Sequence, residues 1–138
     1  MMMVRCYLAP SANEGLGVYA HADIAKGAVV WLFDARYDSV YFKDDLVHVP
    51  AHFRELLERY AFAHPTDPDM IVLDCDEGRF LNHAANPNLD MSNPNRGIAT
   101  RKIRAGEELT WDCSQCTAAA VSFAPSRHRA HGGSQVRQ

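Results

Sequence analysis

Hydrophobic residues in this chain come mostly in short runs that end at turn residues. Two of these runs, residues 28–33 and 70–73, are continuous and rich in β-branched or aromatic side chains. Runs of this length and composition favour buried β-strands. Further strands are predicted at 4–8, 15–20, 97–103 and 107–112, and a hairpin or loop at 34–41. The pattern therefore predicts a β-dominated chain with irregular connections.

Only residues 50–60 show a convincing helical period. Pro50 suits the first turn of a helix, because its missing N–H would have no partner there. The apolar residues that follow recur every three or four positions and form one face. They are Phe53, Leu56, Leu57 and Tyr60. Pro65 and Pro68 exclude a longer helix, so one short helix is predicted.

The stretch 79–88 fits neither pattern, since it holds three Asn, one His and one Pro in ten residues. Asn is unfavourable in helices and strands because its amide competes for nearby backbone groups. We predict a loop that is held by hydrogen bonds from side chains to the backbone and is anchored by residues 79–81. Taken alone, the stretch also fits an ordinary Asn-Pro surface turn.

Size and charge narrow the classes of function. A chain of 138 residues with 47% apolar residues suits a single domain with a real core. The net charge of −3 gives no indication of a nucleic-acid partner. No apolar run approaches the roughly 20 residues of a membrane span, and the start does not resemble a signal peptide. We therefore expect a cytoplasmic protein, with residues 125–138 disordered.

The cysteines give little evidence for a metal site. Cys113 and Cys116 have the spacing of a metal or redox pair, but one pair without further ligands is weak evidence for zinc. No metal is therefore predicted. Cys6 and Cys75 lie in apolar runs, which predicts buried and unreactive thiols.

Three segments in fixed order carry a resemblance to a known family. A lone Gly-x-Gly lacks the third glycine and the helix of a dinucleotide site, so a Rossmann fold is rejected. Together, however, the three segments resemble the SET domain of protein-lysine methyltransferases over roughly residues 4–116. They are Ser11-x-x-x-Gly15-x-Gly17-Val18-Tyr19-Ala20, Arg79-Phe80-Leu81-Asn82-His83-x-x-x-Pro87-Asn88 and Ile103-x-x-Gly106-Glu107-Glu108-Leu109-Thr110-x-Asp112.

The resemblance implies a fold and a reaction. The expected fold is mainly β, a β-clip of small curved sheets with one short helix, in residues 1–116; residues 117–138 form a tail. The C-terminal segment would thread under the Asn-His loop as a pseudoknot. The implied cofactor is S-adenosyl-L-methionine, and the implied partner is a protein or peptide lysine that enters through an aromatic channel from the opposite face. No nucleic acid or membrane is expected as a partner.

Carried over position by position, the resemblance also implies site residues. Glycine would allow the cofactor to approach the backbone closely, because a Cβ would block it. The implied cofactor-binding residues are Gly15, Leu16, Gly17, Arg79, Asn82, His83 and Trp111. The implied channel residues are Tyr60, Phe62 and Trp111. Plain core packing explains Tyr60 and Phe62 equally well.

The first departure from the family concerns closure of the site. Ala84 and Ala85 stand where the family usually has Ser-Cys, and that Cys often binds a zinc shared with a cysteine-rich C-terminal segment. The usual zinc site therefore cannot be assembled. Residues 114–123 or a second subunit, as in a homodimer, would have to close the pocket.

The second departure is Cys113, which replaces the Tyr that usually ends the third motif. A thiol is a weak hydrogen-bonding group on a much shorter side chain, so it cannot replace the phenol. The predicted catalytic positions are Tyr60, Trp111 and Cys113. Three outcomes stay open: Tyr60, Tyr7 or Tyr37 supplies a hydroxyl, activity is weak and rests on alignment alone, or the domain only binds cofactor or peptide.

Overall fold

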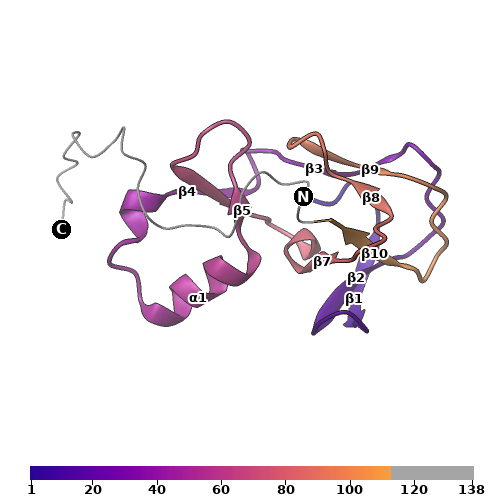
Figure 1. Ribbon diagram of the computed structural model, residues 1–138, viewed down its shortest axis with the longest axis horizontal. Helices are drawn as coiled ribbons and strands as arrows, with labels where there is room; N and C mark the ends of the chain where they lie inside the picture. Colours follow the sequence, from indigo (N-terminus) through magenta and orange to yellow (C-terminus); the bar gives the residue numbers. More distant parts are fainter. Residues whose placement is uncertain (113–138) are drawn as a thin grey trace.

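The computed structural model describes residues 1–112, which form two lobes side by side along the long axis (Figure 1). One lobe holds a four-stranded sheet (β1-β2-β10-β7) and a three-stranded sheet (β3-β9-β8). The other holds the sheet β4-β6-β5 and the helix α1. The strands are β1 Cys6–Pro10, β2 Leu16–Ala20, β3 Val29–Leu32, β4 Ser39–Phe42, β5 Phe62–Ala63, β6 Met70–Leu73, β7 Asn82–His83, β8 Leu89–Asp90, β9 Arg96–Ala99 and β10 Glu108–Trp111. The prediction of a mainly β fold with one short helix is confirmed.

The C-terminal strand β10 lies in the middle of the four-stranded sheet. It pairs antiparallel with β2, where Leu109 is opposite Val18. On its other side it pairs parallel with β7, where Thr110 is opposite Asn82. β10 therefore passes between the N-terminal hairpin and the Asn-His motif, which is the threaded arrangement that the resemblance predicts.

Each lobe has its own hydrophobic core. The larger core lies between the two sheets of the first lobe, and the smaller one lies under α1 (Ala51–Tyr60). Leu57 is the fully buried side chain of α1, as expected for the apolar face of this helix. The fully buried residues of the larger core include Val18, Val30, Leu89, Ile103 and Leu109.

Several predicted boundaries were wrong. β1 lies two residues later than predicted, because its pairing with β2 runs from Cys6 opposite Ala20 to Pro10 opposite Leu16. β9 ends at Ala99 rather than 103, and Ile103 makes a separate bridge to Ile24. The stretch 34–41 divides into a turn and β4, which ends at Phe42.

Two short 3-10 helices were not predicted: η1 (Lys43–Leu46) and η2 (Glu77–Phe80). The Asn-rich stretch was expected to be a loop throughout, but Asn82–His83 form strand β7 because β10 runs beside them. The prediction of a buried Cys75 was also wrong, because this residue is exposed. Cys113, Cys116 and the predicted disordered segment 125–138 lie outside the described residues.

Candidate functional site

Asn82 is the point at which the three motifs meet. Its side-chain nitrogen Nδ2 donates to the backbone oxygens of Glu14 and Leu16, each at 3.0 Å, and to Oε1 of Glu108 at 3.0 Å. Three acceptors around one amide atom identify it as the nitrogen. The first and third motifs are therefore joined through one side chain of the second. The predicted convergence is confirmed.

Glu108 continues this network into the first motif. Its Oε1 accepts a hydrogen bond of 2.7 Å from Ser11 Oγ, and its Oε2 accepts one of 3.2 Å from Asn13 Nδ2. Ser11 Oγ in turn accepts from the backbone N–H of Asn13 at 2.9 Å. The carboxylate thus ties down the turn that precedes Gly17.

The two glycines of the first motif are needed for different reasons. Gly17 is buried, and a Cβ built on it would overlap the carboxylate of Glu108, with the carboxyl carbon at 2.8 Å. Gly15 is exposed and has φ of +50°, a conformation that side chains other than glycine rarely adopt. A close approach to the backbone is therefore possible at Gly15 and at the exposed Leu16.

Asn88 fixes β10 from the side of the Asn-His loop. This residue is 4% exposed; its Nδ2 donates to the backbone oxygen of Glu108 at 2.8 Å, and its Oδ1 accepts from the N–H of Thr110 at 2.9 Å. Its own backbone oxygen accepts from the N–H of Thr100 at 3.0 Å. The loop is therefore held by side-chain to backbone hydrogen bonds, as predicted.

His83 lies at the open end of the same junction. Its side chain is 50% exposed, and its Nδ1 lies 3.7 Å from Oδ1 of Asp112. The backbone N–H of Ala84 donates to the oxygen of Trp111 at 2.9 Å, which continues the parallel pairing past β7. The imidazole is thus exposed beside Asp112, the last described residue, which directly follows β10.

The predicted channel residues have separate partners. Tyr60 packs edge-on against Phe80, with ring centroids 5.1 Å apart, and Trp111 Nε1 donates to the backbone oxygen of Leu81 at 3.3 Å. Tyr60 and Trp111 therefore contact adjacent residues of the second motif. Phe62 instead packs edge-on against Trp31, at 5.4 Å, and belongs to the edge of the larger core.

Arg79 and Phe80 hold the second motif in place. The guanidinium of Arg79 donates to the backbone oxygen of Asp74 at 2.8 and 3.2 Å. This contact supports the turn before the motif, as expected for an anchoring residue. A role of Arg79 toward the cofactor stays a prediction.

The three tyrosines that could replace the missing phenol differ in position. Tyr7 is on the hairpin, stacked on Tyr19 with centroids 5.6 Å apart, and Tyr37 is 59% exposed in a turn beside Arg36. Tyr60 alone of the three packs on the Asn-His motif, through Phe80. A catalytic role for its hydroxyl stays a prediction.

Two electrostatic features decide against thiol chemistry in the described residues. Burial, with smaller contributions from Glu77 and Asp76, raises the pKa of Cys6 to about 11. The pKa of Cys75 is also raised, mainly by desolvation and then by a hydrogen bond to Asp38. A raised pKa leaves little thiolate at neutral pH, so neither residue is an activated nucleophile.

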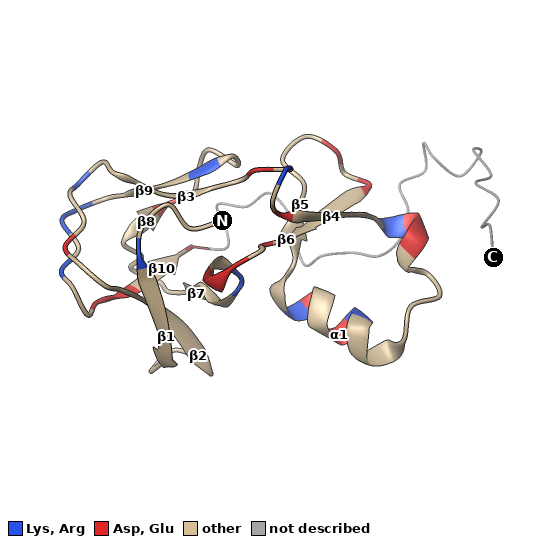
Figure 2. Ribbon diagram, turned by 180° about the vertical axis from the view of Figure 1, so that it is seen from behind, with Lys and Arg blue, Asp and Glu red and all other residues tan. Residues whose placement is uncertain are grey.

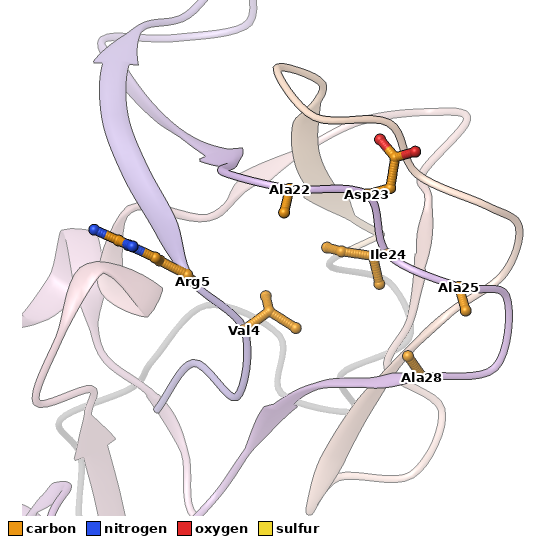
Figure 3. Close-up of a pocket in the computed structure, with 7 residues that line it drawn as sticks. All are labelled: Val4, Arg5, Ala22, Asp23, Ile24, Ala25 and Ala28. Carbon is orange, nitrogen blue, oxygen red and sulfur yellow. The ribbon is translucent and has the colours of Figure 1, made fainter.

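A hollow of about 310 Å³ lies at the far end of the β1–β2 hairpin (Figure 3). It is lined mainly by small apolar side chains, with Arg5 and Asp23 among them. Because Cys6 pairs with Ala20 at this end and Pro10 with Leu16 at the other, the hollow is remote from the glycine turn. It is no part of the junction at Asn82.

The residues at the junction fit the implied cofactor. Among residues 1–112, no donor reaches Oδ1 of Asn82, so this oxygen can accept from an ammonium group. The exposed backbone of Gly15 and Leu16 lies beside it. In the same part of the chain no cluster of three His, Cys, Asp or Glu could hold a metal ion, and no helix is long and apolar enough to span a bilayer.

No role was predicted for Ser11, Glu108 or Asn88, although all three lie within the quoted motifs. The sequence did contain a hint that Glu108 has polar partners, because it is a charged residue in a strand whose next residues, Leu109 and Thr110, are buried. Its partners could not be inferred, because Ser11 lies 97 residues away in the chain.

Comparison with known proteins agrees with this geometry. A family model described as the SET domain matches residues 15–114. Histone-lysine N-methyltransferase trr of Drosophila melanogaster is 30% identical over 116 residues. The match covers 77% of this chain but 5% of trr, so this chain corresponds to a small part of that relative.

Solved structures share the fold. The Chaetomium thermophilum Polycomb Repressive Complex 2, in an autoinhibited conformation bound to S-adenosylmethionine, matches with a TM-score of 0.59 and 22% identity, over 82% of this chain and 15% of that one. A candidate histone methyltransferase of Plasmodium falciparum matches with a TM-score of 0.55 and 19% identity, over 79% of this chain and 92% of that one. At these identities the likeness concerns the fold.

Proposed function

This chain belongs to the SET domain family, and we propose that it is a protein-lysine N-methyltransferase that uses S-adenosyl-L-methionine. The observation that carries the proposal is the junction at Asn82, where one amide joins the glycine turn to Glu108. The relative trr bears the name of a histone-lysine methyltransferase. These facts support the activity class and leave the substrate protein open.

The cofactor would be held by Gly15, Leu16, Asn82 and His83, with Arg79 and Trp111 as further predicted contacts. When bound, S-adenosylmethionine supplies an electrophilic methyl group on a sulfonium. The protein then has to place a lysine amine in line with that methyl group. Alignment of this kind contributes several kcal/mol to lowering a barrier, without a metal or a covalent enzyme intermediate.

The lysine must reach the methyl group as a neutral amine. Its ordinary pKa is about 10.4, and an apolar site lowers that value by disfavouring the charged form. Aromatic walls also tolerate a cationic product through their π faces. We assign this environment to Tyr60 and Trp111, which contact Phe80 and Leu81. Phe62, which packs on Trp31, stays a predicted channel residue.

Charge supports a basic protein segment as the substrate. Residues 34–73, which hold β4, η1, α1, β5 and β6, have eight Asp and Glu against four Lys and Arg. Two of the eight, Asp38 and Asp69, are buried. In this lobe, acidic residues lie at η1 and on α1 (Figure 2). A surface of this sign attracts lysine-rich segments and accelerates their encounter with the site.

The decisive experiment measures binding and transfer separately. Calorimetry should detect S-adenosylmethionine binding, and incubation with isotope-labelled cofactor should label lysine in basic proteins. Asn82→Ala should remove both signals, while Asn86→Ala, an exposed residue of the same loop, should keep them. Binding without labelling of any basic protein, the enzyme itself included, would refute the catalytic proposal.

Cys113 favours a second function, a SET module that binds cofactor or peptide with little or no catalysis. We expect Cys113→Tyr to raise the transfer rate by at least tenfold, because a phenol can orient the amine where a thiol cannot. Cys116→Tyr is the matched control, since it adds the same ring three residues later. An unchanged rate in Cys113→Tyr would remove the thiol as the cause of weak activity.

A further inference from the structure

Glu108 has an unusual set of partners for a carboxylate. Its donors among residues 1–112 are all uncharged: the hydroxyl of Ser11 at 2.7 Å and the amides of Asn82 at 3.0 Å and Asn13 at 3.2 Å. No Lys or Arg in the described part of the chain forms an ion pair with it. The neighbouring Glu107 differs, because it pairs with Arg101 at 3.2 Å.

We propose that Glu108 is a positioning residue that holds the turn 11–17 and Asn82 in the shape that receives the cofactor. The proposal rests on the methyltransferase function proposed above and adds a residue to its binding machinery. In this role Glu108 acts through Ser11, Asn13 and Asn82.

A carboxylate meets all three donors without any rearrangement of its partners. Oε1 receives two donors, Ser11 and Asn82, while Oε2 receives Asn13, so both oxygens must accept. A glutamine presents one oxygen and one NH₂ group. In one orientation its NH₂ faces the pair of Ser11 and Asn82; in the other it faces Asn13, whose amide would have to turn over to accept.

The carboxylate of Glu108 lies between the glycine turn and Asn82, the two parts of the proposed cofactor site. It fills the space beside Gly17 that a Cβ would occupy, and it shares Asn82 Nδ2 with the backbone oxygens of Glu14 and Leu16. Without it, only the bonds from Asn82 Nδ2 to the backbone oxygens of Glu14 and Leu16 would join the Asn82 side chain to the turn. The exposed backbone at Gly15 would then be held less tightly relative to Asn82 Oδ1.

The first measurement needs no cofactor. Amide hydrogen exchange of the whole chain should show residues 11–17 exchanging at least tenfold faster in Glu108→Gln than in the wild type. Glu107→Gln is the matched control and should leave this turn unchanged, because its carboxylate contacts the backbone N–H of Arg104 and the side chain of Arg101.

The second measurement is calorimetry with S-adenosylmethionine and with S-adenosylhomocysteine. We expect the Kd for both to rise about tenfold in Glu108→Gln and to stay within twofold in Glu107→Gln. In turnover, the KM for the cofactor should rise by the same factor, with kcat at saturation little changed. Ser11→Ala, which removes one donor only, gives a smaller effect of the same kind and serves if Glu108→Gln does not fold.

A rescue variant separates positioning from general loss of stability. In the double variant Asn13→Asp with Glu108→Gln, the glutamine NH₂ can donate to Asp at position 13 while its oxygen accepts from Ser11 and Asn82. The Kd should return to within threefold of the wild type. Asn13→Asp alone places two carboxylates face to face and should weaken binding.

The outcomes are distinguishable. Wild-type protein that binds neither ligand would refute the proposed function. Wild-type protein that binds, together with Glu108→Gln that binds equally well and exchanges equally slowly at 11–17, would refute the role of Glu108 alone. An equal loss in Glu107→Gln, or a failure of the double variant to recover, would also overturn it.

Discussion

At the scale of single residues, the site depends on a glycine without a side chain, Gly17, that packs against the hydrogen-bonded carboxylate of Glu108. Gly17 has no room for a side chain, because the carboxylate of Glu108 lies where its Cβ would be. A flexible Glu could ordinarily move aside at little cost. Here it cannot, since Ser11, Asn13 and Asn82 all donate to it.

Gly17→Ala is therefore expected to displace the carboxylate of Glu108 and to lower the free energy of unfolding by about 1–3 kcal/mol, the usual cost of overpacking. Cofactor affinity should fall with it. Urea denaturation and calorimetry measure the two effects. In the Glu108→Ala background, the same substitution should cost clearly less, since the clashing atoms are gone. Additive losses in the double variant would contradict the clash.

The sequence predicted the identity of Gly15, Gly17, Asn82 and His83 as site positions through the resemblance, and the structure brings the glycines and Asn82 together. Asn82 was expected to hold the cofactor, yet its NH₂ is used within the protein. Hydrogen-bond partners 66 to 97 residues apart follow from the tertiary fold. No local pattern could therefore supply them.

At the scale of elements, the continuous apolar runs were the easiest to predict. β6 has the predicted bounds, and β3 lies within the predicted run, because buried β-branched residues identify such strands locally. β5, β7 and β8 have two residues each, and their strand character comes only from a distant partner. β7 exists because β10 pairs with it. The Asn-rich composition of this stretch would by itself disfavour a strand.

At this scale, the prediction concerns the buried Asn88, whose side chain binds the backbone of two residues of β10. Asn88→Ala leaves the backbone oxygen of Glu108 and the N–H of Thr110 without their partner. Each unmet buried group costs about 1–3 kcal/mol, so we expect the loss of two to lower the free energy of unfolding by about 2–6 kcal/mol. Urea denaturation measures it. The control Asn86→Ala, an exposed residue of the same loop, should stay within about 0.5 kcal/mol. Similar losses in both variants would show that β10 is held by other contacts.

At the scale of the whole molecule, the two lobes meet at Asp74, which follows β6 in one lobe and accepts from Trp31 Nε1 of β3 in the other, at 3.1 and 3.2 Å. The Met1 ammonium lies 3.3 Å from its Oδ1, and Asp38 shares that ammonium. Desolvation is the largest influence and raises the pKa of Asp74 to about 6; the ammonium and the Trp31 hydrogen bond lower it, and Asp38 raises it further.

This raised pKa makes the contact between the lobes sensitive to pH. The folded protein binds the Asp74 proton more tightly than the unfolded chain, so the stabilising contribution is fully present below the unfolded pKa of about 4. It is lost as the pH rises through about 6. A shift of about two units corresponds to at most about 3 kcal/mol. Asp74→Asn should therefore flatten the pH dependence of stability between pH 4 and 6, because the amide does not titrate.

Urea denaturation at half-unit steps across this window measures the effect. Asp90→Asn is a control of opposite sign, because a backbone hydrogen bond from Ser92 lowers the pKa of Asp90. The stability that Asp90 contributes is present above its unfolded pKa and lost only as the pH falls below it, so this variant should keep the wild-type slope between pH 4 and 6. If Asp74→Asn also keeps that slope, the buried carboxyl at the junction of the lobes does not control the acid response, and desolvation at Asp74 is weaker than its burial indicates.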